Sequence, residues 1–271
     1  FMFIKKDKYG VGTGRLRKLR VLSAIIVGCC VLFINTAGVA ANGSVHTESE
    51  KKPEPIAEGE VSAALLAEVG TGRVVYEYNS EEKLPAAGLT RLAALVSVCK
   101  GFDEGRLKPG DAVSVSEKAA GIGGTTAFLK AGEQMDAETM LLAAVMINAG
   151  DATHSLALAA AGSESAAVQE INACMAGIGV ETNFSEICGA GEKLSASELA
   201  KIGAALTASE SYRKFGTKFY EKIEHNTGAG ATELANPNKL VKQYSGCIGV
   251  GTGSSTEAGY CGVFAAKRGN T

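Results

Sequence analysis

The chain has 271 residues, of which 46% are hydrophobic and 21% charged, so it can bury a substantial core and is not disordered as a whole. Its net charge is −2, but residues 1–41 carry +6 and the remainder −8. An acidic body of this kind is a poor binder of nucleic acid, and we expect no nucleic-acid partner.

Residues 1–41 have the organisation of an export leader. Basic residues up to Arg20 precede an apolar run, 21–34, and small residues then place a cleavage site after Ala40 or Ala41. The run is shorter than the roughly 20 residues that cross a bilayer, which favours a signal peptide over an uncleaved signal anchor. The polar stretch 42–60 is predicted to be a linker. We therefore predict export across the cytoplasmic membrane, to the extracellular or cell-wall side, with a membrane anchor as the alternative.

The folded domain is predicted to comprise residues 61–271. Strand-like runs at 61–69 and 73–78, joined by a glycine-containing turn, indicate a hairpin. Apolar spacing and start signals predict helices over about 89–99, 136–146, 151–161, 163–177 and 196–207. Strand-like sequence returns at 246–251 and 259–267. Strands from both chain ends around a helical insertion predict an α+β fold, with an antiparallel sheet packed with helices.

The histidines and cysteines do not form a recognisable ligand set. His46, His154 and His225 are scattered and lack the spacing of a metal site, and no nucleotide-binding motif is present. We therefore predict neither a metal nor a cofactor. His46 and His154 are expected to be solvated or to have an ordinary structural role, and His225 lies in a polar segment without a recognisable catalytic partner. The cysteines outside the leader are predicted to be mostly small buried residues. They are Cys99, Cys174, Cys188, Cys247 and Cys261.

Three lysines recur at helical spacing. Lys214, Lys218 and Lys222 are four residues apart, with apolar residues beside them. This pattern favours one solvated face of a helix, and a basic surface that associates with a membrane is the alternative.

Several ordered segments carry a family resemblance. They are 64–73, 84–91, 128–134, 256–261 and 266–268. From about residue 61 to the end, the chain resembles the bacterial serine D-alanyl-D-alanine carboxypeptidases, the low-molecular-mass penicillin-binding proteins. The resemblance implies a penicillin-binding/beta-lactamase-like transpeptidase fold, a place in the cell wall and peptidoglycan stem peptides as ligands. It also implies a further sheet strand beyond Thr271, so we expect the domain to be truncated at its C-terminal end.

The resemblance also implies three catalytic motifs, S-x-x-K, S-x-N and K-T-G, in which a lysine activates a serine nucleophile. At the first motif this chain has Gly88 in place of the serine and Arg91 in place of the lysine. Glycine has no side chain to acylate. Arginine, with a pKa above about 12, cannot accept a proton near neutral pH.

The other two motifs are altered as well. The second falls on residues 148–151, where Asn148 replaces the serine and Gly150 the asparagine. In the third, Gly251 replaces the lysine, and only Thr252 and Gly253 are kept. We predict that Thr252 and Gly253 bind substrate and that no catalytic residue is intact.

These substitutions predict a catalytically inactive, wall-binding or regulatory pseudoenzyme. One alternative is an active carboxypeptidase that uses another hydroxyl as its nucleophile. The candidates are Thr90, Ser97, Thr125 and Thr126. A second alternative is a decayed gene fragment without function. The sequence leaves the oligomeric state open.

Overall fold

The computed structural model describes residues 2–5, 61–189, 191–228 and 230–269, which all belong to one compact unit. The predicted linker 42–60 and the predicted leader, apart from residues 2–5, lie outside the described residues, and so does His46. None of the described helices is long and apolar enough to cross a bilayer.

A five-stranded antiparallel sheet combines strands from both ends of the chain, in the order β10-β11-β1-β2-β3. The strands are β1 (Met2–Lys5), β2 (Ala63–Ala67), β3 (Val74–Tyr78), β10 (Cys247–Ser255) and β11 (Gly259–Ala266). The predicted hairpin is β2–β3, and a second hairpin pairs β10 with β11. The prediction of a sheet built from both chain ends is confirmed, and β10 is an edge strand of the described sheet.

Strand β1 lies between β11 and β2. Its residues pair with Tyr260–Val263 on one side and with Ala63–Leu65 on the other. Since β11 has 8 residues and β1 only 4, β1 pairs with half of its neighbour. The sequence analysis assigned these four residues to the leader, and the structure places them in the sheet.

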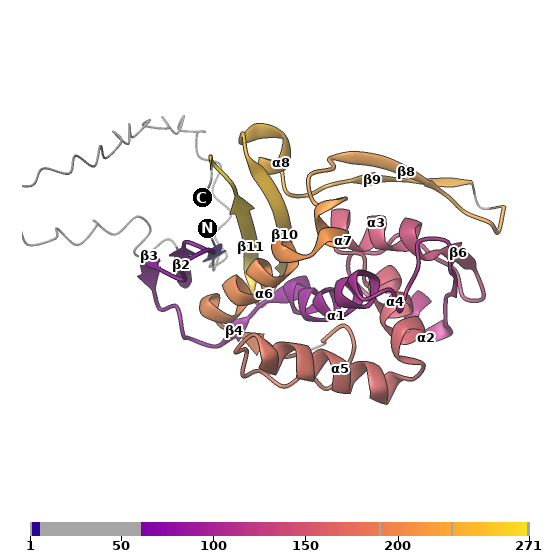
Figure 1. Ribbon diagram of the computed structural model, residues 1–271, viewed down its shortest axis with the longest axis horizontal. Helices are drawn as coiled ribbons and strands as arrows, with labels where there is room; N and C mark the ends of the chain where they lie inside the picture. The colour runs from indigo at the N-terminus through magenta and orange to yellow at the C-terminus, as the bar shows by residue number, and fades with distance from the viewer. Residues whose placement is uncertain (1, 6–60, 190, 229, 270–271) are drawn as a thin grey trace, which may run out of the picture. The chain divides into compact units, whose positions relative to one another are not determined.

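The helices lie in the chain between the two hairpins (Figure 1). They are η1 (Ala87–Thr90), α1 (Arg91–Asp103), α2 (Glu117–Ala120), α3 (Ala137–Ile147), α4 (Gly150–Ala161), α5 (Glu164–Gly177), α6 (Ala196–Ala208), α7 (Glu210–Arg213) and α8 (Leu240–Gln243). All five predicted helices are present. Helix α1 is the central one, because it packs against α4, α5 and α6 and is buried on most of its faces.

Side-chain caps explain where two of these helices begin. The Oδ1 atom of Asp136 accepts the backbone N–H of Thr139 at 2.8 Å at the start of α3. Ser195 and Glu198 form a capping box at the start of α6. Each cap satisfies a backbone donor that has no partner within its own helix, so these residues fix the first turn.

Three short antiparallel pairs complete the described fold. They are β4 (Leu84–Pro85) with β7 (Lys193–Leu194), β5 (Ala112–Ser114) with β6 (Gln134–Asp136), and β8 (Tyr220–Glu224) with β9 (Ala231–Ala235). We call the last pair the ribbon. In Figure 1 it extends beside α3 toward the β6 region.

The ribbon corrects the prediction of a basic helix face. Helix α7 ends at Arg213 and Lys222 lies in β8, so the three lysines do not share one helix. The alternation around Ile223, which is buried while its neighbours are not, has the period of a strand. Each lysine is also paired with a glutamate. The side chains of Lys214, Lys218 and Lys222 are therefore not an unpaired basic surface.

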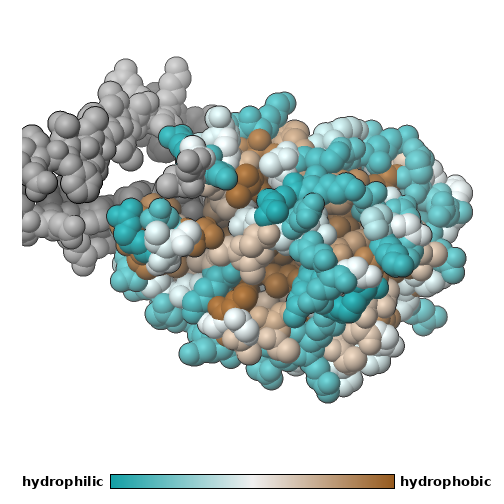
Figure 2. Space-filling view, viewed as in Figure 1, coloured by the Kyte–Doolittle hydropathy of each residue, from teal (hydrophilic) through white to brown (hydrophobic). Residues whose placement is uncertain are grey.

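The core lies between the sheet and the helices. It contains Cys99, Cys174, Cys247 and Cys261, and Cys188 is half-buried, so the prediction of mostly buried cysteines is confirmed. All five are free thiols. Figure 2 shows mainly hydrophilic side chains over the described part of one face, with apolar side chains visible between them.

Candidate functional site

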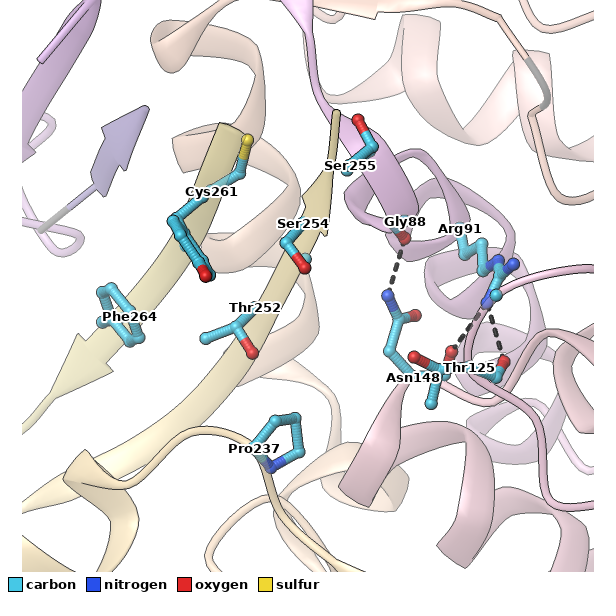
Figure 3. A pocket seen from close by; sticks show the side chains of 15 residues that line it. Gly88, Arg91, Thr125, Asn148, Pro237, Thr252, Ser254, Ser255, Cys261 and Phe264 are labelled. Atoms are coloured by element: carbon cyan, nitrogen blue, oxygen red, sulfur yellow. Dashed lines mark hydrogen bonds between the residues drawn. The ribbon is translucent and has the colours of Figure 1, made fainter. Parts of the chain in front are cut away.

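A hollow of about 700 Å³ lies where edge strand β10 meets η1 and the start of α1. We call it the cleft. Figure 3 shows Thr252 and Ser254 on its sheet side, and Gly88, Arg91 and Asn148 on its helical side. The lining residues are Ala87, Gly88, Arg91, Gly124, Thr125, Asn148, Pro237, Thr252, Gly253, Ser254, Ser255, Tyr260, Cys261, Gly262 and Phe264.

The cleft brings together most of the residues that the motif comparison singled out. Five of the seven line it directly; they are Gly88, Arg91, Asn148, Thr252 and Gly253. Gly150 contacts Arg91 behind the cleft wall, since a Cβ atom on Gly150 would lie 3.0 Å from Nη1 of Arg91. Gly251 faces the core, where a Cβ atom would lie 3.4 Å from Cδ2 of Leu92.

Gly88 leaves room for a side chain. A Cβ atom at this position would have only Nδ2 of Asn148 within 4 Å, at an ordinary contact distance of 3.7 Å. Gly253 is in the opposite situation, because a Cβ atom there would lie 3.2 Å from the backbone nitrogen of Gly88. Glycine at 253 thus lets β10 approach η1 closely. What Gly88 lacks is a hydroxyl group, while the space for one is present.

Arg91 is bound by backbone carbonyl groups. Its side chain is buried, and Nη1 donates to the carbonyl oxygens of Thr125 at 2.8 Å and Asn148 at 3.3 Å. Nη2 donates to the carbonyl oxygen of Gly123. Among the described residues, no carboxylate forms an ion pair with this guanidinium. Carbonyl dipoles therefore compensate for the buried charge, and the group acts only as a donor.

Asn148 joins the end of α3 to η1. Its backbone has φ 56° at the C-cap of α3, a left-handed conformation that asparagine tolerates better than most residues. Its Nδ2 atom donates to the carbonyl oxygen of Gly88 at 2.6 Å. Its Oδ1 atom is buried and has no hydrogen-bond partner among the described residues. Asn148 holds the nucleophile position in place without offering it a base.

Asp151 holds the loop 123–129, part of which lines the cleft on its helical side. Its buried carboxylate accepts the backbone N–H groups of Ala127 at 2.9 Å, Leu129 at 3.0 Å and Ala152 at 2.8 Å. The first two flank Phe128, whose φ of 60° turns both N–H groups toward one acceptor. The sequence analysis missed this role, although an acid at the start of an otherwise apolar helix is a usable signal.

The cleft contains hydroxyl groups but no base for them. Hydroxyls come from Thr125, Thr252, Ser254 and Ser255 and from a tyrosine, whereas no lysine, histidine, aspartate or glutamate is among the lining residues. Cys261 also lines the cleft, but burial raises the pKa of its thiol to about 11. A thiol of that kind stays protonated near neutral pH and is a poor nucleophile.

The hydroxyls considered as substitute nucleophiles are not equally placed. Only Thr125 lines the cleft. Thr90 is buried, and its hydroxyl donates to the carbonyl oxygen of Gly189 at 2.8 Å. Ser97 is buried within α1. Thr126 is half-buried and is not a lining residue.

Each of the two described histidines lies beside a glutamate that the sequence analysis did not identify. His225 lies between Glu133 and Thr232, with Nδ1 2.8 Å from Oε1 of Glu133 and Nε2 2.8 Å from the hydroxyl of Thr232. This contact fastens the ribbon to the loop before β6. His154 is buried in α4, with Nε2 2.9 Å from a carboxylate oxygen of Glu164, and burial lowers its pKa. The described part of the chain has no group of three or more histidine, cysteine, aspartate or glutamate side chains placed to hold a metal ion.

The antiparallel sheet from both chain ends, the central helix and the cleft at the edge strand agree with the penicillin-binding fold of the solved structures compared below. The D-alanyl-D-alanine carboxypeptidase family matches residues 47–271, and the chain belongs to this family. D-alanyl-D-alanine carboxypeptidase DacF of Bacillus subtilis (strain 168) is 32% identical over 255 residues, which are 93% of this chain and 64% of DacF. The chain thus spans less than two thirds of that relative.

Solved structures share the fold. The D-alanyl-D-alanine carboxypeptidase DacD of Francisella tularensis superposes with a TM-score of 0.68 at 20% identity, over 76% of this chain and 62% of that one. A mutant of the Streptomyces K15 DD-transpeptidase gives a TM-score of 0.68 at 23% identity, over 76% of this chain and 85% of that one. The predicted family and fold class are confirmed.

Proposed function

We propose that this protein is an exported pseudoenzyme that binds peptidoglycan stem peptides in the cleft without cleaving them. The family activity is serine-type D-Ala-D-Ala carboxypeptidase hydrolysis. One observation carries the proposal: the cleft is present, but glycine occupies the nucleophile position and a carbonyl-bound arginine occupies the base position.

The kinetic consequence is severe. Removing the nucleophile from a coupled catalytic group costs about a million-fold in turnover, and losing its partners as well adds little. A substitute hydroxyl would need an adjacent base, and the lining residues supply none. Turnover by this chain should therefore be about a million-fold below that of an intact family member.

Binding of a peptide requires fewer functional groups than its hydrolysis does. Strand β10 carries Thr252 and Gly253 at the edge of the described sheet, where backbone groups can pair with an extended peptide. The cleft also has apolar surface and several hydroxyls, the usual combination in small-ligand sites. Export is supported by the basic and apolar pattern of residues 1–41 and by the place of the family in peptidoglycan metabolism.

The test uses the purified full-length chain, with folding established by circular dichroism and a cooperative melt. We expect no covalent adduct with fluorescent penicillin by intact mass and no D-alanine release from a pentapeptide. We do expect saturable binding of an acetylated peptide ending in D-Ala-D-Ala. An active family member serves as the positive control.

Each other outcome refutes the proposal in a recognisable way. A stoichiometric adduct would identify the active alternative, and peptide mapping would then locate the nucleophile. A folded protein that does not bind wall peptides would remove the binding function. An insoluble or unfolded product would favour the decayed gene fragment.

A further inference from the structure

Gly150 packs so closely against Arg91 that a larger residue at position 150 would not fit beside the guanidinium. A Cβ atom on Gly150 would lie 2.8 Å from Cζ and 3.0 Å from Nη1 of Arg91, and 2.7 Å from Cγ2 of Ile122. Distances below 3.0 Å are essentially never seen for real Cβ atoms, so some group would have to move. Any side chain at 150 therefore competes with the guanidinium for the same volume.

A second glycine borders the guanidinium from the loop side. Gly124 has φ +81°, and a Cβ atom on it would lie 3.1 Å from Nη2 of Arg91. The planar group is thus flanked by Gly124 and Gly150, which together leave room for it. The carbonyl oxygen of Thr125 accepts from Nη1 of Arg91 at 2.8 Å and from the backbone nitrogen of Gly150 at 2.9 Å. That one oxygen links the cleft loop to both α1 and α4.

The hydrogen bonds of Arg91 connect it to the wall of the cleft. A long cation placed at random in a buried position would lack hydrogen-bond partners, at a large cost in desolvation. Arg91 instead reaches three carbonyl oxygens, and two of them belong to the loop 123–125 that forms the cleft wall.

We infer that Arg91, Gly124 and Gly150 form one packing unit, in which Arg91 is a positioning residue that holds loop 123–125 as the cleft wall and so sets the affinity of the cleft for peptides. The part about affinity rests on the proposed function. The part about packing does not, and it has its own test.

The packing test compares Gly150→Ala in two backgrounds of the full-length protein, wild type and Arg91→Met. With Arg91 present, the added methyl group should lower Tm by about 2–12 °C, the range expected from overpacking in a domain of this size. Methionine has no atom at the positions of Cζ and Nη1, while the contact with Cγ2 of Ile122 stays, so the same substitution should lower Tm by a smaller amount there. Gly88→Ala is the matched control, because its Cβ atom would meet only one atom, at 3.7 Å. Equal losses of Tm in both backgrounds would overturn the packing unit.

The positioning test measures the loop and the ligand directly. The amides of Gly150 and Ala127 tie the loop down, since they donate to the carbonyl oxygen of Thr125 and to the carboxylate of Asp151, each at 2.9 Å. Their hydrogen exchange should be at least tenfold faster in Arg91→Met than in wild type, with partial recovery in Arg91→Lys. The dissociation constant for the acetylated D-Ala-D-Ala peptide should rise at least tenfold. The control is a substitution of Ile171, which is buried in α5, chosen to match the loss of Tm.

Failure of this inference is distinguishable from failure of the proposed function. If wild type does not bind the peptide, the proposed function fails, while loop exchange still decides whether Arg91 positions the wall. If Arg91→Met exchanges and binds like wild type while folded, the positioning role is wrong. If the Ile171 control weakens binding equally, affinity follows global stability and the role of Arg91 is again refuted.

Discussion

Asp151→Asn offers a sharp test of how the cleft wall is held. The carboxylate accepts three buried backbone N–H groups, two of which flank the left-handed Phe128. Asparagine keeps one acceptor oxygen and turns an NH₂ group toward at least one of those donors. A hydrogen bond to a charged group contributes about 1.5–3 kcal/mol, so losing one or two should reduce the unfolding free energy by about 1.5–6 kcal/mol. That corresponds to a decrease in Tm of roughly 3–24 °C for a domain of this size.

The assay for this prediction is thermal unfolding combined with amide hydrogen exchange. We expect exchange at Ala127 and Leu129 to increase more than exchange in α5. Asp136→Asn is the matched control, since the Asp136 carboxylate also accepts a backbone N–H, that of Thr139, but is exposed. Its loss of Tm should be a few degrees at most. If Asp151→Asn costs no more than this control, the carboxylate does not hold the loop.

Three further outcomes are expected. Gly88→Ser should fold with Tm within a few degrees of wild type yet form no penicillin adduct, because Arg91 cannot take the serine proton; an adduct by intact mass would contradict this. Burial raises the pKa of Glu198, but hydrogen bonds from Lys83 and neighbouring backbone amides outweigh it, so the folded pKa lies below the ordinary 4.5. Its stabilising contribution is present above about pH 4.5 and lost as pH falls through the folded pKa, so Glu198→Gln should flatten that acid decline in Tm. Burial lowers the pKa of His154 below 6.5, so stability should decrease as pH falls below that value, and His154→Gln should remove this decrease in a pH series of melts.

The fold was predictable because local signals and the global arrangement agree. Caps at Asp136 and Ser195 and apolar spacing in α1 each specify an element on their own. The ribbon was not predictable in this way, because its short strands depend on pairing with each other and on the distant Glu133.

The candidate site, too, was predictable only where a single residue carries the signal. The loss of nucleophile and base could be predicted from single positions, Gly88 and Arg91, because each residue type excludes a chemical role by itself. The carbonyl partners of Arg91 and the role of Asp151 could not, since backbone atoms of a loop carry no signature in the sequence. Predicting them would require knowing where loop 123–129 crosses α1 and α4.

The ribbon contacts the rest of the protein at its tip, where Nδ1 of His225 lies 2.8 Å from Oε1 of Glu133. At its base the ladder continues by one rung, since the backbone N–H of Asn236 donates to the carbonyl oxygen of Phe219 at 2.8 Å. The next residue, Pro237, belongs to the rim of the cleft. One hairpin therefore joins the loop before β6, on the helical part of the fold, to the lining of the cleft.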